Sequence, residues 1–381
     1  MPETDDDLGR SDPPTLSGML VLDLSRLLPG AVLARQLADL GARVVKVEEP
    51  GVGDPLRLVP PQVEGVGIAF AALLAGVESV VLDLRRTTDA ARLRRLVLEA
   101  DVLVESFRPG TLESWGLGLD ELTAANPRLV ACSLPAWPGD GPRAARVAHD
   151  LNLTAETGAL ELLGGGVPAL QLADVGAGLL AATAVAAALL RRERTGRGAR
   201  IVQPLACGVL PFLTWALAEA GLGRERVLAT LLGGGVPCYR RYAAGDGREL
   251  TVAALEPKFW AALVEALELP ELAGAGLAFG PAGEGVVDAV QARLAAAPCD
   301  HWTELAAALG LPLAAVRTLE EAAADPALSA AGATAALPLP GGGATVTSGP
   351  WIPSLSLPSG RPAPRLGEHT DSILGELLGP P

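Results

Sequence analysis

Between residues 19 and 133, short apolar runs alternate with amphipathic segments, and this alternation constrains the fold more than any other feature. Residues 19–24 (MLVLDL) form an apolar run that is typical of a buried strand. Pro29 and Gly30 open a helical segment that ends near Gly41, and residues 42–47 (ARVVKV) follow as a second strand. Because a helix connects the two strands, we expect them to pair in parallel.

The same alternation continues along the first third of the chain. Helices are expected at 67–76, 88–100 and 119–125, and strands at 79–84, 101–105 and 129–133. Regular strand–helix alternation is typical of a parallel sheet covered by helices on both faces. The sequence therefore predicts a doubly wound, Rossmann-like α/β domain.

A second, smaller α+β domain is expected over residues 235–325. Its pattern is a hairpin at 238–253 followed by short helices between Pro and Gly breaks. We expect a disordered leader at 1–17 and a large domain at 18–220 that is completed by 335–381. Residues 221–234 and 326–334 are expected to be linkers, and a docked helix is expected over 366–378.

Charge and cysteine content exclude several classes of function. The chain has 381 residues and a net charge of −14, which argues against nucleic acid as its main partner. Its four cysteines are far apart, so we expect reduced thiols and no zinc site. The first residues are acidic, unlike a signal peptide, and the apolar run at 175–190 is half Ala and Gly. A cytoplasmic protein with a buried core helix and no membrane span is expected.

Dinucleotide binding is the first alternative that the α/β pattern raises. The turn after the first strand, residues 25–30 (SRLLPG), lacks the glycines that let a backbone approach a pyrophosphate. Residues 176–181 (GAGLLA) fit GxGxxA, but no strand–helix–strand unit encloses them. Nicotinamide or flavin binding is therefore disfavoured.

Three polar residues are candidates for acid/base chemistry. His149, one of three histidines, precedes Asp150, and Asp174 interrupts an uncharged segment rich in Ala and Gly. Imidazole can take and return protons near neutral pH, and an isolated buried carboxyl group is costly. Glu256 precedes Pro257 at an expected helix start. Helix capping is the competing interpretation of Asp150, Asp174 and Glu256.

Ten short motifs, in order and spacing, resemble those of the family III (CaiB/BaiF-type) CoA-transferases, and within them the α-methylacyl-CoA racemase branch. The resemblance runs from about residue 18 to residue 370. The motifs are 41–51 (GARVVKVEEPG), 79–84 (SVVLDL), 100–110 (ADVLVESFRPG), 126–130 (NPRLV), 149–152 (HDLN), 172–174 (LAD), 194–198 (RTGRG), 246–247 (DG), 255–260 (LEPKFW) and 367–370 (GEHT).

The resemblance implies an interlocked homodimer whose large domain holds coenzyme A as part of an acyl-CoA substrate. It implies that His149 and Asp174 are the two acid/base residues of a racemase and that Glu256 orients His149. It places Arg43 and Arg108 near the phosphates or adenosine of CoA. No metal and no tightly bound cofactor is expected.

Two enzyme activities and one binding function fit these residues. A racemase that inverts a 2-methylacyl-CoA needs a base on one face of the α-carbon and an acid on the other. A CoA-transferase would instead use Asp174 as a nucleophile that forms an acyl anhydride. The chain departs from the family pattern at Val77 and Glu78, at Ala148 and over residues 134–140 (LPAWPGD). Because of these departures, a CoA-binding protein without turnover remains a third hypothesis.

Overall fold

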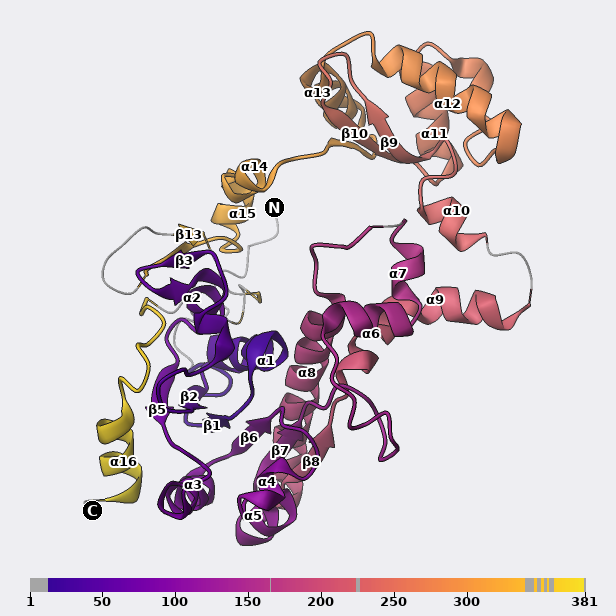
Figure 1. Cartoon of the computed structure of the whole chain (residues 1–381). Coiled ribbons are helices and arrows are strands. Elements are labelled where there is room, and N and C mark those ends of the chain that lie inside the picture. Colours follow the sequence, from indigo (N-terminus) through magenta and orange to yellow (C-terminus); the bar gives the residue numbers. More distant parts are fainter. Residues whose placement is uncertain are drawn as a thin grey trace. The chain divides into compact units, whose positions relative to one another are not determined.

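The computed structural model describes residues 13–164, 166–223, 227–339, 346–347, 351–352, 355 and 360–379. The chain divides into two compact units, which Figure 1 draws in sequence colours from indigo to yellow. The first unit contains Met1–Thr157, Val167–Pro211 and Asp325–Pro381. The second unit contains Gly158–Gly166 and Phe212–Ala324.

A six-stranded parallel sheet forms the centre of the first unit. Its strand order is β5-β2-β1-β6-β7-β8. The strands are β1 (Leu20–Asp23), β2 (Arg43–Glu48), β5 (Glu78–Val81), β6 (Val102–Glu105), β7 (Val130–Ser133) and β8 (Ala199–Val202). In order of the chain this is 3-2-1-4-5-6, so the direction of winding reverses between β1 and β6, as in dinucleotide-binding folds. The predicted doubly wound α/β fold is confirmed.

Helices cover both faces of this sheet. The elements of the first unit outside the central sheet are α1 (Leu27–Asp39), η1 (Pro55–Arg57), β3 (Gln62–Val63), β4 (Val66–Gly67), α2 (Ile68–Leu73), α3 (Thr87–Glu99), α4 (Thr111–Ser114), α5 (Leu119–Ala125), α6 (Asp150–Glu156), α8 (Leu172–Thr195), η2 (Leu205–Gly208), α15 (Pro326–Ala330), β12 (Ala336–Leu337), β13 (Val346–Thr347) and α16 (Thr370–Leu378). Helix α9 (Leu210–Gly221) crosses the boundary between the units.

Side chains of each strand alternate between two apolar cores. Val21 packs with α1, α2 and α8 on one face, whereas Leu20 and Leu22 pack with α3, α5 and α16 on the other. Period-two alternation of a strand explains why consecutive residues enter different cores. Burial on both faces explains why the strands read as uninterrupted apolar runs in the sequence.

Both ends of the chain contribute to this unit. Residues 1–12 of the expected leader lie outside the described residues, but Leu16 is buried and its N–H donates to the carbonyl of Leu40 at 2.8 Å. The C-terminal helix α16 buries Ile373 against the core that contains α3. Arg43 also joins β2 to α16 through Glu376 at 2.6 Å.

Helix α8 is the longest helix of the described residues, and its glycines allow close packing. A Cβ at Gly176 would lie 2.3 Å from the carbonyl oxygen of Gly208, and one at Gly178 would lie 2.6 Å from that of Pro29. The two glycines of the GxGxxA match, Gly176 and Gly178, therefore allow α8 to pack closely against its neighbours. By length and composition α8 alone among the described helices could cross a membrane, but half of its apolar window is buried in the protein.

The second unit is built on a three-stranded antiparallel sheet with the order β11-β10-β9. The hairpin register pairs Glu249 with Ala243, and Gly247 occupies the turn with φ of 81°. Trp260, Val290 and Trp302 from three helices fill the core against this sheet. The elements are α7 (Ala159–Leu162), α10 (Leu228–Leu232), β9 (Tyr239–Ala243), β10 (Glu249–Ala253), α11 (Pro257–Ala266), η3 (Pro270–Leu272), α12 (Gly280–Leu294), α13 (Cys299–Leu309), β11 (Leu313–Ala315) and α14 (Leu319–Ala323).

Candidate active site

Two adjoining cavities open at the carboxyl edge of the parallel sheet, on either side of the β1/β6 reversal. In open α/β sheets this is the place where ligands bind. The first cavity has a volume of about 440 Å³, and the second about 340 Å³. Four residues line both cavities: Arg26, Ser106, Phe107 and Arg108.

The wall of the first cavity contains a fully buried lysine. Lys46 Nζ lies 3.0 Å from Asp23 Oδ2 and 2.9 Å from Asp54 Oδ2, and it donates to the carbonyl of Ser25 at 2.6 Å. Burial opposes a charge on Lys46, but the two carboxylates outweigh it and raise the lysine pKa. The cluster ties the ends of β1 and β2 to the N-cap of η1.

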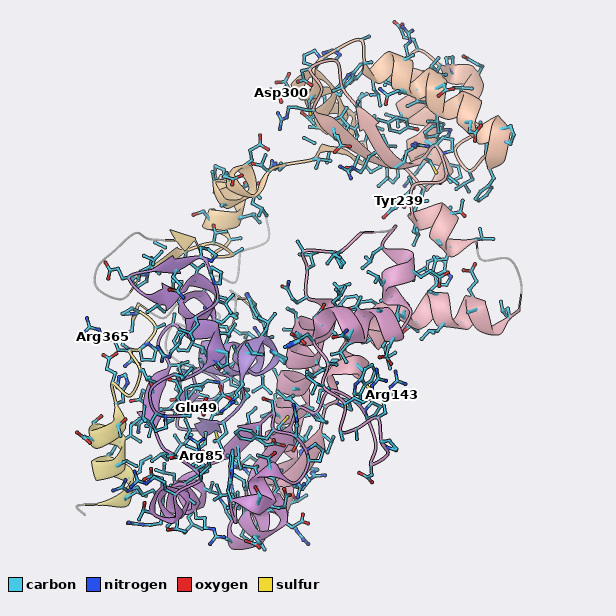
Figure 2. All side chains as sticks on the ribbon, viewed as in Figure 1. Glu49, Arg85, Arg143, Tyr239, Asp300 and Arg365 are labelled. Atoms are coloured by element: carbon cyan, nitrogen blue, oxygen red, sulfur yellow. The ribbon has the colours of Figure 1, made fainter. Side chains whose placement is uncertain are left out.

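Arginines follow the ends of three strands at the first cavity. Arg26 follows β1 and pairs with Glu49 at 3.2 Å, and Arg85 follows β5 and pairs with Asp83 at 2.8 Å. Figure 2 labels Glu49 and Arg85, which lie close together at this edge. Arg108 follows β6, and no carboxylate of the described residues lies within ion-pair distance of it. Arg108 therefore offers both cavities a guanidinium group that is free to receive an anion.

His149 and Asp174 both line the second cavity, together with Arg146 and the apolar side chains of Leu27 and Leu134. His149 is the N-cap residue of α6 and is exposed. Asp174 lies in the first turn of α8 and is half-buried. Two residues that are separated by 25 positions in the chain thus line one cavity because α6 packs against α8.

Asp174 has an unusual protonation equilibrium for an aspartate. Burial, and secondly the negative charge of Asp150, raise its pKa to about 7. A carboxyl group whose pKa is raised in this way can give and accept a proton near neutral pH, as a general acid or base must.

Asp150 caps a helix, but not the helix that follows it. The sequence suggested that it could be the N-cap of the segment after it, and that Asp174 could cap its own helix. In the structure His149 is the N-cap of α6. The Asp150 carboxylate instead accepts hydrogen bonds from the N–H groups of Ala173 at 2.7 Å and Asp174 at 3.0 Å.

Two of the residues singled out from the sequence are not among those that line the two cavities. Arg43 lines neither cavity, and its guanidinium pairs with Glu78 and Glu376, each at 2.6 Å. Glu256 belongs to the second unit, where it is the exposed N-cap residue of α11. A function of Glu256 in orienting His149 stays a prediction.

Three arginines of the cavity walls were not singled out in the sequence: Arg26, Arg85 and Arg146. A signal was available for the first two, because each closely follows a run that the pattern predicts to be a buried strand. Arg146 had no such signal. It lies in an irregular segment and pairs with Glu156 of α6 at 2.6 Å.

The fold and the site together define an α/β protein in which an imidazole and a carboxyl group line one cavity near the reversal point of a doubly wound sheet. Comparison with known families identifies the family to which this protein belongs. The profile of CoA-transferase family III matches residues 16–370, and the chain belongs to this family.

Relatives within the family carry out different reactions. The chain is 36% identical over 262 residues to the α-methylacyl-CoA racemase of Homo sapiens, a match that covers 67% of this chain and 65% of the racemase. It is 31% identical to the acetyl-CoA:oxalate CoA-transferase of Acetobacter aceti, with 95% and 96% of the two chains covered. A CaiB/BaiF family protein of Brucella suis is similar in structure, with a TM-score of 0.82 at 28% identity over 96% of this chain and 100% of that one.

Proposed function

We propose that this protein racemises or epimerises a 2-methylacyl-CoA by moving the proton α to the thioester. The observation that carries the proposal is that His149 and Asp174 line one cavity. Inversion requires two groups that can each give and accept a proton, and the raised pKa of Asp174 lets its carboxyl group do so near neutral pH. Glu256 would orient His149.

The substrate's coenzyme A would occupy the first cavity, with its thioester reaching the second. Three guanidinium groups, those of Arg26, Arg85 and Arg108, are available there for phosphate groups. We assign Arg108 the largest contribution to phosphate binding, because it has no ion pair among the described residues that would have to break first. Arg43 would act on this cavity only indirectly, since it holds β2 against β5 and α16.

The active assembly is proposed to be a cytoplasmic interlocked homodimer, and a monomeric mass in light scattering would contradict the dimer.

CoA transfer is the second candidate, and Asp174 is again its central residue. The ionised carboxylate would attack the thioester carbonyl and the C–S bond would break. CoA would depart as the thiolate, and Asp174 would remain joined to the acyl group as a mixed anhydride. Similarity to CoA-transferases over nearly the whole chain favours this reaction. Against it, a pKa of about 7 leaves a smaller share of Asp174 ionised at neutral pH than an ordinary aspartate has.

One assay separates the candidates. The protein is incubated with a 2-methylacyl-CoA in deuterated water, and α-proton exchange and transfer of CoA to a free carboxylic acid are both followed. We expect exchange in the unmutated protein and a loss of at least about 10²-fold in both His149→Ala and Asp174→Ala. Transfer without exchange, lost in Asp174→Ala but retained in His149→Ala, would establish the transferase. CoA binding without either activity would leave a binding protein.

A further inference from the structure

The carboxylate of Asp150 connects the two helices that carry His149 and Asp174. One of its oxygens, Oδ1, accepts the N–H groups of both Ala173 and Asp174, at 2.7 and 3.0 Å. Its other oxygen accepts the hydroxyl of buried Thr154 at 3.3 Å. Both oxygens are therefore used, one toward α8 and one within α6.

Helix α8 depends on this contact because it has no cap of its own. Its N-cap residue, Gln171, makes no side-chain capping hydrogen bond. The first N–H groups of a helix need acceptors, and a carboxylate is a strong one. Here the acceptor comes from the residue next to His149 in the chain, so that a single peptide bond separates the histidine from the anchor of Asp174.

The histidine is held by the same short segment. The N–H of His149 donates to the side-chain oxygen of Asn152 at 3.1 Å, which fixes the start of α6 from within. Residues 149–152 thus hold their own helix start through Asn152 and the start of α8 through Asp150.

We propose that Asp150 is a positioning residue, which locks the start of α8 to the start of α6 so that Asp174 and His149 face one cavity in a fixed relation. The inference rests on the proposed function for the proton transfers that this relation serves. Misplacement of a reacting group by about 1 Å costs roughly 10²-fold in rate.

The charge of Asp150 has a second effect, because it lies beside Asp174 and disfavours ionisation of that carboxyl group. The other charged or titratable groups that line the second cavity are Arg26, Arg108, Arg146 and His149. Cys207 lies in η2, which packs against α8. Of all these groups Asp150 is the one whose charge shifts the pKa of Asp174.

Two substitutions separate the hydrogen bonds from the charge. Asp150→Asn keeps an oxygen that can accept the N–H groups of Ala173 and Asp174, whereas Asp150→Ala removes both acceptor and charge. Without the negative charge Asp174 ionises at lower pH, so the acidic limb of the pH profile of kcat should move to lower pH in Asp150→Asn. Asp150→Ala should lower kcat roughly 10²-fold with less than a twofold change in KM.

A measurement independent of turnover completes the test. The carboxyl carbon of Asp174 is followed by NMR in protein labelled with ¹³C-aspartate and is assigned by its absence in Asp174→Asn. We expect it to titrate near pH 7 in the unmutated protein and at lower pH in Asp150→Asn. Asp371→Asn, an exposed aspartate of α16 outside both cavities, serves as the matched control and should change neither titration nor kcat.

The outcomes are distinguishable from failure of the proposed function. Absence of α-proton exchange in the unmutated protein would overturn the racemase assignment, and the NMR titration would then decide about Asp150 alone. An unchanged titration of Asp174 in Asp150→Asn would overturn the charge effect of Asp150. A kcat in Asp150→Ala equal to that of the unmutated protein would overturn its positioning role.

Discussion

Whether a charged side chain can be buried depends on the partners of that one residue, as the two lysines show. Only two lysines occur in the chain, and they lie in opposite environments. Lys46 is fully buried between Asp23 and Asp54, whereas Lys258 is exposed and lies near the ring of Phe259. A buried charge persists only where partners replace its lost hydration. Lys46 is therefore part of the framework that shapes the first cavity.

Lys46→Met should destabilise the protein by about 3–5 kcal/mol, because it leaves two buried carboxylates without their cation. The free energy of unfolding, measured in guanidinium chloride by circular dichroism, tests this. Lys258→Met is the matched control and should shift that free energy by less than about 0.5 kcal/mol. Equal values for the two variants would show that Lys46 contributes nothing as a buried ion partner.

At the scale of elements, the contact between α8 and α1 decides how closely the helices approach. Gly178 faces α1, where an added Cβ would lie 2.6 Å from both the carbonyl oxygen of Pro29 and a methyl group of Val32. Because α1 begins directly after β1 at the two cavities, this packing also sets the position of the cavity walls.

Gly178→Ala should destabilise the protein by about 1–3 kcal/mol, because the methyl group overpacks the interface and either helix must shift. Gly375→Ala in α16 is the control, since the site is exposed and nothing lies within 4 Å of the added Cβ. That variant should gain up to about 1 kcal/mol from helix propensity. Thermal unfolding of both variants gives the comparison, and a stable Gly178→Ala would contradict the close contact.

At the scale of the whole molecule, the four cysteines report on the packing of both units. Cys132 and Cys207 lie in the first unit, and Cys238 and Cys299 in the second. All four are free thiols, and three of them are buried, Cys207 being the partly exposed one. Burial raises the pKa of the thiol in each case, to about 12 for Cys132.

A thiol-specific disulfide reagent at pH 8 should therefore modify at most one cysteine rapidly in the native protein, and all four after unfolding. Raised pKa values and burial both lower the rate, because the thiolate is the reactive form. Cys207→Ser should remove the rapid phase. Rapid modification of two or more thiols in folded protein would contradict the described packing.

Much of the fold could be predicted because its signals are local. The strand at 20–23 and the helix at 119–125 follow from apolar runs and helical spacing within a few residues. The bounds of the compact units could not be read in the same way. Residues 158–166 cluster with the second unit although they lie between α6 and α8 of the first, and only contacts distant in sequence reveal that.

The candidate site could likewise be predicted only in part. His149 and Asp174 stood out because polar residues are rare in an apolar stretch, and the structure brings both to one cavity. The partners of each charge were hidden, because ion pairs form across the fold. Arg43 meets Glu376 from the far end of the chain, and Asp150 caps a helix that begins 22 residues later.

The sequence by itself thus determined the order of strands and helices and the residue types available for acid/base chemistry, because hydrophobic period and side-chain chemistry are local properties. Only the tertiary structure decided that Lys46 is buried, that arginines after three strands line one cavity, and that Asp150 anchors Asp174. These features depend on strand order and helix packing, in which burial and charge partners are set by residues far apart in the chain.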